Sequence, residues 1–263
     1  MKARGLNSRL KALLDYKADY YNQHSFVGDD PVSVPHRFKG KADREIAAFF
    51  SATLAWGNRK SIVKSGLRLM ALMDDAPAAF VDGFSEKDLS RFRGFVHRTF
   101  NEDDLLFFLY ALKNIYQRHG GLEAVFNQGY QRSSRHGTGG IKSAIMHFRD
   151  VFFSMPHPER SLKHLSNPAA GSAAKRLNMF LRWMIRKDDA GVDFGLWNAF
   201  STGDLYCPLD VHSGRVARSL GLLKRKQNDW KAVEELTANL RLFDPEDPVK
   251  YDFALFGMGV FEK

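Results

Sequence analysis

The sequence predicts an all-α protein, and three observations support this class. Apolar residues recur at steps of three and four along most of the chain, which is the period of a helix. Runs of alternating β-branched residues are scarce, and no Asn-Gly or Asp-Gly pair joins two such runs. The 263 residues are 44% hydrophobic and include 22 Phe, enough for a substantial core. We expect a two-lobed helical bundle of about a dozen helices.

The expected elements are taken in chain order. Helices are predicted over 3–23, 42–56 and 59–73, over two or three segments within 76–116, and over 121–127 and 141–153. Ser85 with Asp88, and Asn101 with Asp104, have the spacing of helix starts. The two prolines of 29–35 predict an interruption, and the Gly-, Ser-, Arg- and His-rich stretch 128–140 predicts a loop. A lobe boundary is expected either near 128–140 or near 154–160, within one domain spanning 1–263.

Composition restricts the class of protein and its partners. The chain has 39 Lys plus Arg against 30 Asp plus Glu, a net charge of +9, which suits a polyanionic partner. Cys207 is the one cysteine, so a disulfide framework, a four-thiolate zinc site and a four-cysteine iron–sulfur cluster are excluded. The start lacks a secretion signal, and no apolar run reaches the roughly 20 residues that span a bilayer. We therefore expect a soluble, cytoplasmic protein with no membrane partner.

A lysine follows a predicted tight turn in the C-terminal half. Pro168 and Gly171 indicate the turn, and Ser172 is placed to cap the next helix. Lys175 falls in the first turn of this helix, where free amides and a partial positive charge suit a phosphate and favour a neutral, nucleophilic amine. The helix has one apolar stripe, formed by Leu177, Phe180, Leu181, Met184 and Ile185. Lys175, Arg182 and Arg186 fall on its opposite side, where the plainer interpretation is that they are solvated cations.

An aspartate precedes the next helix. Pro208 favours an extended entry, and a helix is predicted from about Val211 to Leu220, with Gly221 at its end. Asp210 therefore stands at the N-cap. It either caps the helix only, or it is also a carboxylate held rigidly by the amides for chemistry.

Taken together, these segments resemble the helix-hairpin-helix DNA glycosylases, which include endonuclease III and the 8-oxoguanine DNA glycosylases. The matching features are the Pro/Gly hairpin, Lys175 in the following helix, and the Pro-Leu-Asp-Val-His turn at Asp210. The spacing between Lys175 and Asp210 is similar to that of the archaeal-type 8-oxoguanine enzyme. In this family the lysine attacks the sugar and the aspartate assists. The hairpin departs from the family's Gly-x-Gly, because it reads Ala169-Ala170-Gly171-Ser172.

The resemblance is specific over 166–259, and before that it is looser. The stretch 45–54 matches the family's early helix, which ends at a base-reading loop. A second resemblance, carried by 175–183 and 244–259, is to a largely uncharacterised bacterial family.

The first resemblance implies a function and a set of site residues. It implies excision of a damaged base, with 8-oxoguanine favoured, and strand cleavage through a Schiff base. The implied roles are catalysis by Lys175 and Asp210, base recognition by Trp56, Asp252 and Phe256, and DNA binding by Gly171, Ser172, Arg176 and Arg215. The implied partner is damaged double-stranded DNA, bound by a monomer. No metal or other cofactor is expected, and a monovalent cation at the hairpin is left open.

Several alternatives remain at this point. The chain is either such an enzyme, a glycosylase for another lesion, or a non-catalytic helical DNA- or RNA-binding protein of the same fold. The nine histidines contain no His-x-x-x-His pair, so a histidine metal site is weakly supported. Trp56 and Phe256 are equally explained by core packing, and Asp252 by helix capping.

Overall fold

The computed structural model describes residues 2–134 and 140–262. Within them lie twelve α-helices, five short 3-10 helices and one two-stranded hairpin, so the predicted all-α class is confirmed. The chain divides into two compact units. Unit 1 combines Met1–Phe26 with Asn167–Lys263, and unit 2 is Val27–Ser166. The divisions therefore fall in neither 128–140 nor 154–160, where a boundary was expected. No helix among the described residues is both long and apolar enough to cross a membrane.

Unit 2 is a helical bundle around a phenylalanine core. Phe108 packs edge-to-face on Phe152 at 4.8 Å, and Phe126 stacks on Phe148 at 4.3 Å. Its elements are α2 (Ser33–His36), α3 (Lys41–Leu54), α4 (Arg59–Leu72), α5 (Pro77–Gly83), η2 (Asp88–Phe92), β1 (Val96–His97), β2 (Phe100–Asn101), α6 (Glu102–His119), α7 (Leu122–Ser134), α8 (Gly140–Phe152) and η3 (Glu159–His164). β1 and β2 are antiparallel, with Val96 opposite Asn101. The hairpin was not predicted, because two-residue strands are too short to show an alternating pattern.

The predicted loop over 128–140 is wrong for most of its length. The helix predicted over 121–127 continues to Ser134 as α7, a new helix begins at Gly140, and 135–139 lie outside the described residues. Gly129 does not break α7, because it is where α7 meets α8. A Cβ there would lie 2.5 Å from Cβ of His147. The glycine therefore permits close helix packing.

Two residue pairs in unit 2 were predicted to mark helix starts. Asn101 and Asp104 mark the start of α6, as predicted, and together they form a capping box. Asp88 accepts hydrogen bonds from Ser85, but the element that begins there is a short 3-10 helix rather than an α-helix. The expected interruption near 29–35 also contains one helical turn, α2, which includes Pro35.

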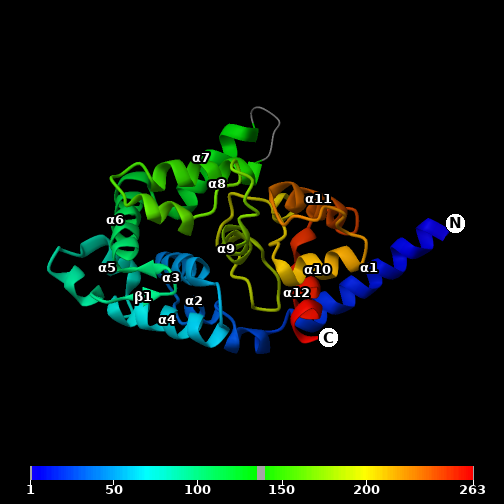
Figure 1. Cartoon of the computed structure of the whole chain (residues 1–263), viewed down its shortest axis with the longest axis horizontal. Helices are drawn as coiled ribbons and strands as arrows, with labels where there is room; N and C mark the ends of the chain where they lie inside the picture. The colour runs from blue at the N-terminus through cyan, green and yellow to red at the C-terminus, as the bar shows by residue number, and fades with distance from the viewer. Residues whose placement is uncertain (1, 135–139, 263) are drawn as a thin grey trace. The chain divides into compact units, whose positions relative to one another are not determined.

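Unit 1 is built around the C-terminal helix. Its elements are α1 (Lys2–Tyr21), the first part of η1 (His24–Asp29), α9 (Lys175–Ile185), η4 (Thr202–Asp204), α10 (Val211–Ser219), α11 (Trp230–Arg241), η5 (Pro248–Lys250) and α12 (Tyr251–Phe261). α12 packs against α1 and α10 (Figure 1). Glycines allow both approaches, since a Cβ at Gly257 would lie 2.2 Å from the Tyr21 ring, and one at Gly259 would lie 2.9 Å from the His212 carbonyl.

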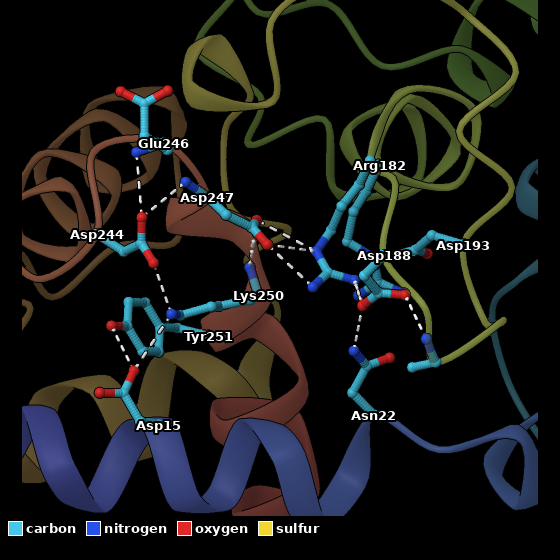
Figure 2. Close-up of polar contacts among 12 residues, drawn as sticks. Asp15, Asn22, Arg182, Asp188, Asp193, Asp244, Glu246, Asp247, Lys250 and Tyr251 are labelled. Atoms are coloured by element: carbon cyan, nitrogen blue, oxygen red, sulfur yellow. Dashed lines mark hydrogen bonds and ion pairs between the residues drawn. The ribbon is translucent and has the colours of Figure 1, made fainter.

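A network of ion pairs lies beside α9. The Arg186 guanidinium pairs with Asp188, Asp193 and Asp247, and its side chain is only 4% exposed. Figure 2 shows Arg182, Asp188, Asp193 and Asp247 converging in this network. The interpretation of Arg182 and Arg186 as solvated cations is therefore wrong. The charges are tolerated in the interior because each arginine has two or more carboxylate partners.

A second set of polar contacts anchors α1. Lys250 pairs with Asp15 at 3.3 Å and with Asp244 at 2.6 Å, and the Tyr251 hydroxyl donates to Asp15 at 2.8 Å (Figure 2). These contacts tie α1 to the start of α12. They fix the helix that carries two of the candidate base-recognition residues.

Candidate active site

Lys175 is the first residue of α9, and a tight hairpin precedes it. Asn167 organises this hairpin, since its Oδ1 accepts the Ala169 amide at 2.9 Å and its carbonyl accepts the Ser172 amide at 3.1 Å. Gly171 has a φ of +87°, in the left-handed region that favours glycine. The sequence thus forms the predicted turn, and the turn delivers Lys175 to the start of a helix.

The helix begins later than the predicted start near Ser172. Ala174 stands at the N-cap with a φ of +46°, and no described side chain caps the first turn. The Ser172 hydroxyl instead accepts the amide of Ala174 at 3.3 Å. Without a side-chain cap, the first-turn amides at Lys175 and Arg176 keep the electrostatic character of a helix N-terminus.

Asp210 is the N-cap of α10, as predicted. Its Oδ1 accepts the amides of His212 at 2.8 Å and Ser213 at 2.9 Å, and the Ser213 hydroxyl accepts the Asp210 amide in return. This capping box fixes the carboxylate through one oxygen. The other oxygen, Oδ2, is left to face a second group.

That second group is Lys175. Its Nζ lies 3.5 Å from Oδ2 of Asp210, and the two side chains are 27% and 23% exposed. Burial raises the pKa of Asp210, but the charge of Lys175 and the amide hydrogen bonds from Ser213 and His212 outweigh it, so the pKa lies below its ordinary value. Asp210 is therefore a fixed, ionised carboxylate at neutral pH, in contact with a partly accessible amine.

A second carboxylate, Asp252, contributes to the field at Lys175. It lies in the first turn of α12, it is 7% exposed, and Nη1 of Arg182 donates to its Oδ2. Burial raises the pKa of Asp252 to about 6, against the opposing charges of Arg182 and Lys175. Asp252 is thus bound by an arginine, which the simple capping interpretation did not include.

Phe256 lies one turn further along α12. Its ring centroid is 5.8 Å from Nζ of Lys175, and it packs edge-to-face on Phe26 at 6.4 Å. The ring is half-buried, so it is neither a fully buried core residue nor a free surface residue. The structure therefore brings Lys175, Asp210, Asp252 and Phe256 together from three helices.

The predicted phosphate-binding residues of the hairpin are used by the turn itself. The Gly171 amide donates to the Pro168 carbonyl at 3.0 Å, and the Ser172 amide donates to the Asn167 carbonyl. The Gly171 carbonyl accepts the Trp230 amide at 2.9 Å, which ties the hairpin to α11. Gly171 and Ser172 thus shape the turn, and their amides already have acceptors.

The two predicted arginines differ in environment. Arg176 is half-buried near the start of α9, and burial lowers its pKa to about 10. An anion beside it would offset that loss of hydration. Arg215 is exposed on α10, and its Nη2 donates to the Gly259 carbonyl at 2.8 Å, near the end of α12. Arg215 therefore has a structural contact in addition to its predicted role.

Trp56 belongs to unit 2, in the connection between α3 and α4. The ring is half-buried, and the Arg98 guanidinium stacks on it at 4.8 Å. Its Nε1 has no hydrogen-bond partner among the described residues. The core-packing interpretation is thus incomplete for Trp56, and its role in base recognition stays a prediction.

Arg182 is the site residue that sequence reasoning missed. It joins two carboxylates, with Nε donating to Asp193 at 3.2 Å and Nη1 donating to Asp252. A signal was present, since Arg182 lies between Leu181 and Trp183 in an apolar run. A cation flanked in this way is more easily buried with partners than solvated.

The comparisons with known proteins place the chain in a family. The profile described as "Protein of unknown function (DUF2400)" matches residues 30–261. The chain belongs to the DUF2400 family. No curated protein and no solved structure matches this DUF2400 protein. The matched range includes Lys175, Asp210 and Asp252, whereas α1 lies before it. Within residues 2–134 and 140–262, no three His, Cys, Asp or Glu side chains group as metal ligands.

Proposed function

We propose that this DUF2400 protein is a helix-hairpin-helix DNA glycosylase that removes a damaged base, with 8-oxoguanine favoured, and then cuts the strand as an AP lyase. One observation carries the proposal. Nζ of Lys175 lies 3.5 Å from Oδ2 of Asp210, while backbone amides hold Oδ1 of the same carboxylate. The hairpin that ends at Lys175 and the helix that begins after Asp210 support the finer fold assignment.

Breaking the glycosidic bond needs a fixed negative charge. Positive charge develops on the sugar as the bond lengthens, and a preorganised carboxylate stabilises it. Asp210 meets this requirement because its pKa is lowered and its orientation is set by the α10 amides. The leaving base takes the bonding electron pair, and the ammonium group of Lys175, which is paired with Asp210, gives it a proton and becomes a neutral amine.

The amine then completes the reaction. The lone pair of neutral Lys175 attacks C1′ of the sugar and forms a C1′–N bond. The C1′–O4′ bond then breaks, O4′ takes up a proton as a hydroxyl group, and the open sugar is held as a protonated Schiff base. Removal of a C2′ proton moves electrons toward the iminium nitrogen, and β-elimination expels the 3′ phosphate. Hydrolysis of the remaining imine frees Lys175. No cofactor is needed for any of these steps.

The target base must leave the helix stack to reach Lys175. Phe256 offers an aromatic face near Nζ, and Asp252 offers a carboxyl group one turn away on α12. With its pKa raised to about 6, Asp252 is a hydrogen-bond acceptor at neutral pH and a partial donor below it. The partner is damaged double-stranded DNA, which the net charge of +9 favours.

Borohydride trapping tests the proposal directly. Reduction of the Schiff base should link the protein covalently to duplex DNA that contains 8-oxoguanine. Lys175→Ala should abolish the adduct and strand cutting, whereas Lys231→Ala, at an exposed lysine of α11, should trap like the wild type. A panel of duplexes with single lesions then ranks the substrates.

The alternative is that Lys175 and Asp210 have a structural role only. If Lys175 and Asp210 only tie α9 to α10, no lesion gives a trapped adduct and Lys175→Ala changes only the stability. An adduct that survives in Lys175→Ala would assign the nucleophile to another residue. Either result overturns the proposal as stated.

A further inference from the structure

Unit 2 carries a basic surface that the proposed chemistry does not use. α4 contains four basic residues, at positions 59, 60, 64 and 68, and no acidic residue. Lys60, Lys64 and Arg68 are exposed at intervals of one helical turn, so they share one face. The opposite side of α4 is buried, including Ile62, Leu69 and Met70. The cations therefore form a row on the outside of a helix that is fixed to the core.

The β1–β2 hairpin extends this row. His97 Nδ1 lies 2.9 Å from the Ser65 hydroxyl, and the Arg68 guanidinium stacks on Phe95 at 5.6 Å. The hairpin thus lies along α4, and Figure 1 shows β1 close to α4. Arg98, at the turn of the hairpin, adds an exposed guanidinium that stacks on Trp56.

We call Lys60, Lys64, Arg68 and Arg98 the α4 basic face. In the part of the chain that the structure describes, none of the four forms an ion pair. Arg91 and Arg160, in the same unit, are by contrast paired with Asp74 and Asp104. The positive charge of the face is therefore not neutralised internally.

Arg98 stands in the two-residue turn that joins β1 and β2. Arg98 has a φ of +56°, which disfavours a non-glycine residue by roughly 1 kcal/mol. The positive φ belongs to the tight turn itself, because two-residue hairpin loops require it. The guanidinium of this exposed residue stacks on Trp56, and a guanidinium is suited to bind phosphate through its N–H groups.

We propose that the α4 basic face binds the phosphate backbone of double-stranded DNA, independently of base sequence and of any lesion. Lys60 and Arg68 are about 12 Å apart along the helix axis, at about 1.5 Å per residue. One DNA strand carries a phosphate every 3.4 Å or so of axis, so the row spans about three or four phosphates. An anionic membrane fits less well, because the apolar side of α4 is buried rather than exposed for insertion. The proposal does not rest on the chemistry at Lys175.

Salt-dependent binding to undamaged duplex DNA tests it, with fluorescence anisotropy as the readout. In Lys60→Gln/Lys64→Gln/Arg68→Gln, binding should weaken at least about tenfold near 100 mM salt, and the slope of log K against log salt should fall by about 2 to 3. The matched control is Lys39→Gln/Lys87→Gln/Arg118→Gln, which removes the same charge from exposed cations of unit 2 outside the face. Its slope should change by less than about 1.

Two further measurements keep the result decisive. The charge-conserving Lys60→Arg/Lys64→Arg/Arg68→Lys should keep the wild-type slope, and circular dichroism should show all variants folded. Equal loss in the two glutamine triples would overturn the proposal, because net charge alone would then explain binding. The proposal would also be overturned, in favour of a membrane partner, if Lys60→Gln/Lys64→Gln/Arg68→Gln lost binding to phosphatidylserine vesicles while its DNA binding stayed intact. Undamaged DNA gives no trapped adduct, so this test and the trapping test fail separately.

Discussion

Nζ of Lys175 lies 3.5 Å from Oδ2 of Asp210, and the capping of α10 explains why that oxygen is free to face the amine. The amides of His212 and Ser213 bind Oδ1, so the aspartate completes a helix terminus with one oxygen and meets the lysine with the other. Capping and chemistry are therefore compatible in one side chain. The two roles can be separated by substitution.

Asp210→Asn should separate them. The amide oxygen can still accept from the α10 amides, so stability should fall by less than in Asp210→Ala, which loses the cap at about 0.5–2 kcal/mol. Both variants lose the negative charge, and single-turnover base release should slow on the order of 10²–10³-fold in each. Urea unfolding and quenched-flow assays measure the two effects. Wild-type release by Asp210→Asn would contradict an electrostatic role.

Asp252 should make stability fall as the pH rises from about 4 to about 7. Its folded pKa is raised to about 6 from an ordinary value of 3.8, so the folded state binds the proton more tightly than the unfolded chain. This contribution is complete below about pH 4 and is lost as pH passes about 6, and it amounts to about 3 kcal/mol at most. Urea unfolding across this range should show a smaller decline for Asp252→Asn. An identical decline in both proteins would refute the assignment.

Arg182→Met should be strongly destabilising. The substitution leaves Asp193 and Asp252 as buried carboxylates without their shared arginine, which costs about 3–5 kcal/mol. Arg215→Met is the matched control, since this exposed arginine makes one bond to the Gly259 carbonyl, and its loss should cost about 1 kcal/mol. Chemical denaturation compares the two. Similar losses would mean that the buried network contributes little.

Gly171→Ala should destabilise the hairpin before Lys175. A residue with a Cβ at a φ of +87° costs about 1–2 kcal/mol, although no described atom lies within 4 Å of the added carbon. Gly83→Ala adds a methyl group with equal space but lies in α5 without a positive φ, so it should be neutral or stabilising by up to about 1 kcal/mol. Thermal melts of the two variants should therefore shift in opposite directions, or only the first should shift.

The helices were the predictable part of the fold. α3, α4 and α8 match their expected ranges closely because each has a strong apolar period. α7 was cut short in the prediction because Gly129 and the polar residues after it look like a loop in isolation. Only contact with α8 shows that a glycine was needed there.

The candidate site was predictable where local chemistry defines it. Asp210 at an N-cap and Lys175 after a turn can be inferred from turn and cap residues alone. Arg182 was misjudged because its carboxylate partners, Asp193 and Asp252, come from other parts of the chain. The uses of Gly171 and Ser172 within the turn likewise became visible only in the folded chain.

The sequence by itself determined the helical class, the turn before α9 and the cap of α10, because these depend on residues that are neighbours along the chain. The tertiary structure alone decided which charges are buried and which amine meets which acid. That decision depends on α9, α10 and α12 packing together, since a charge enters the interior only where distant segments supply its counter-charge.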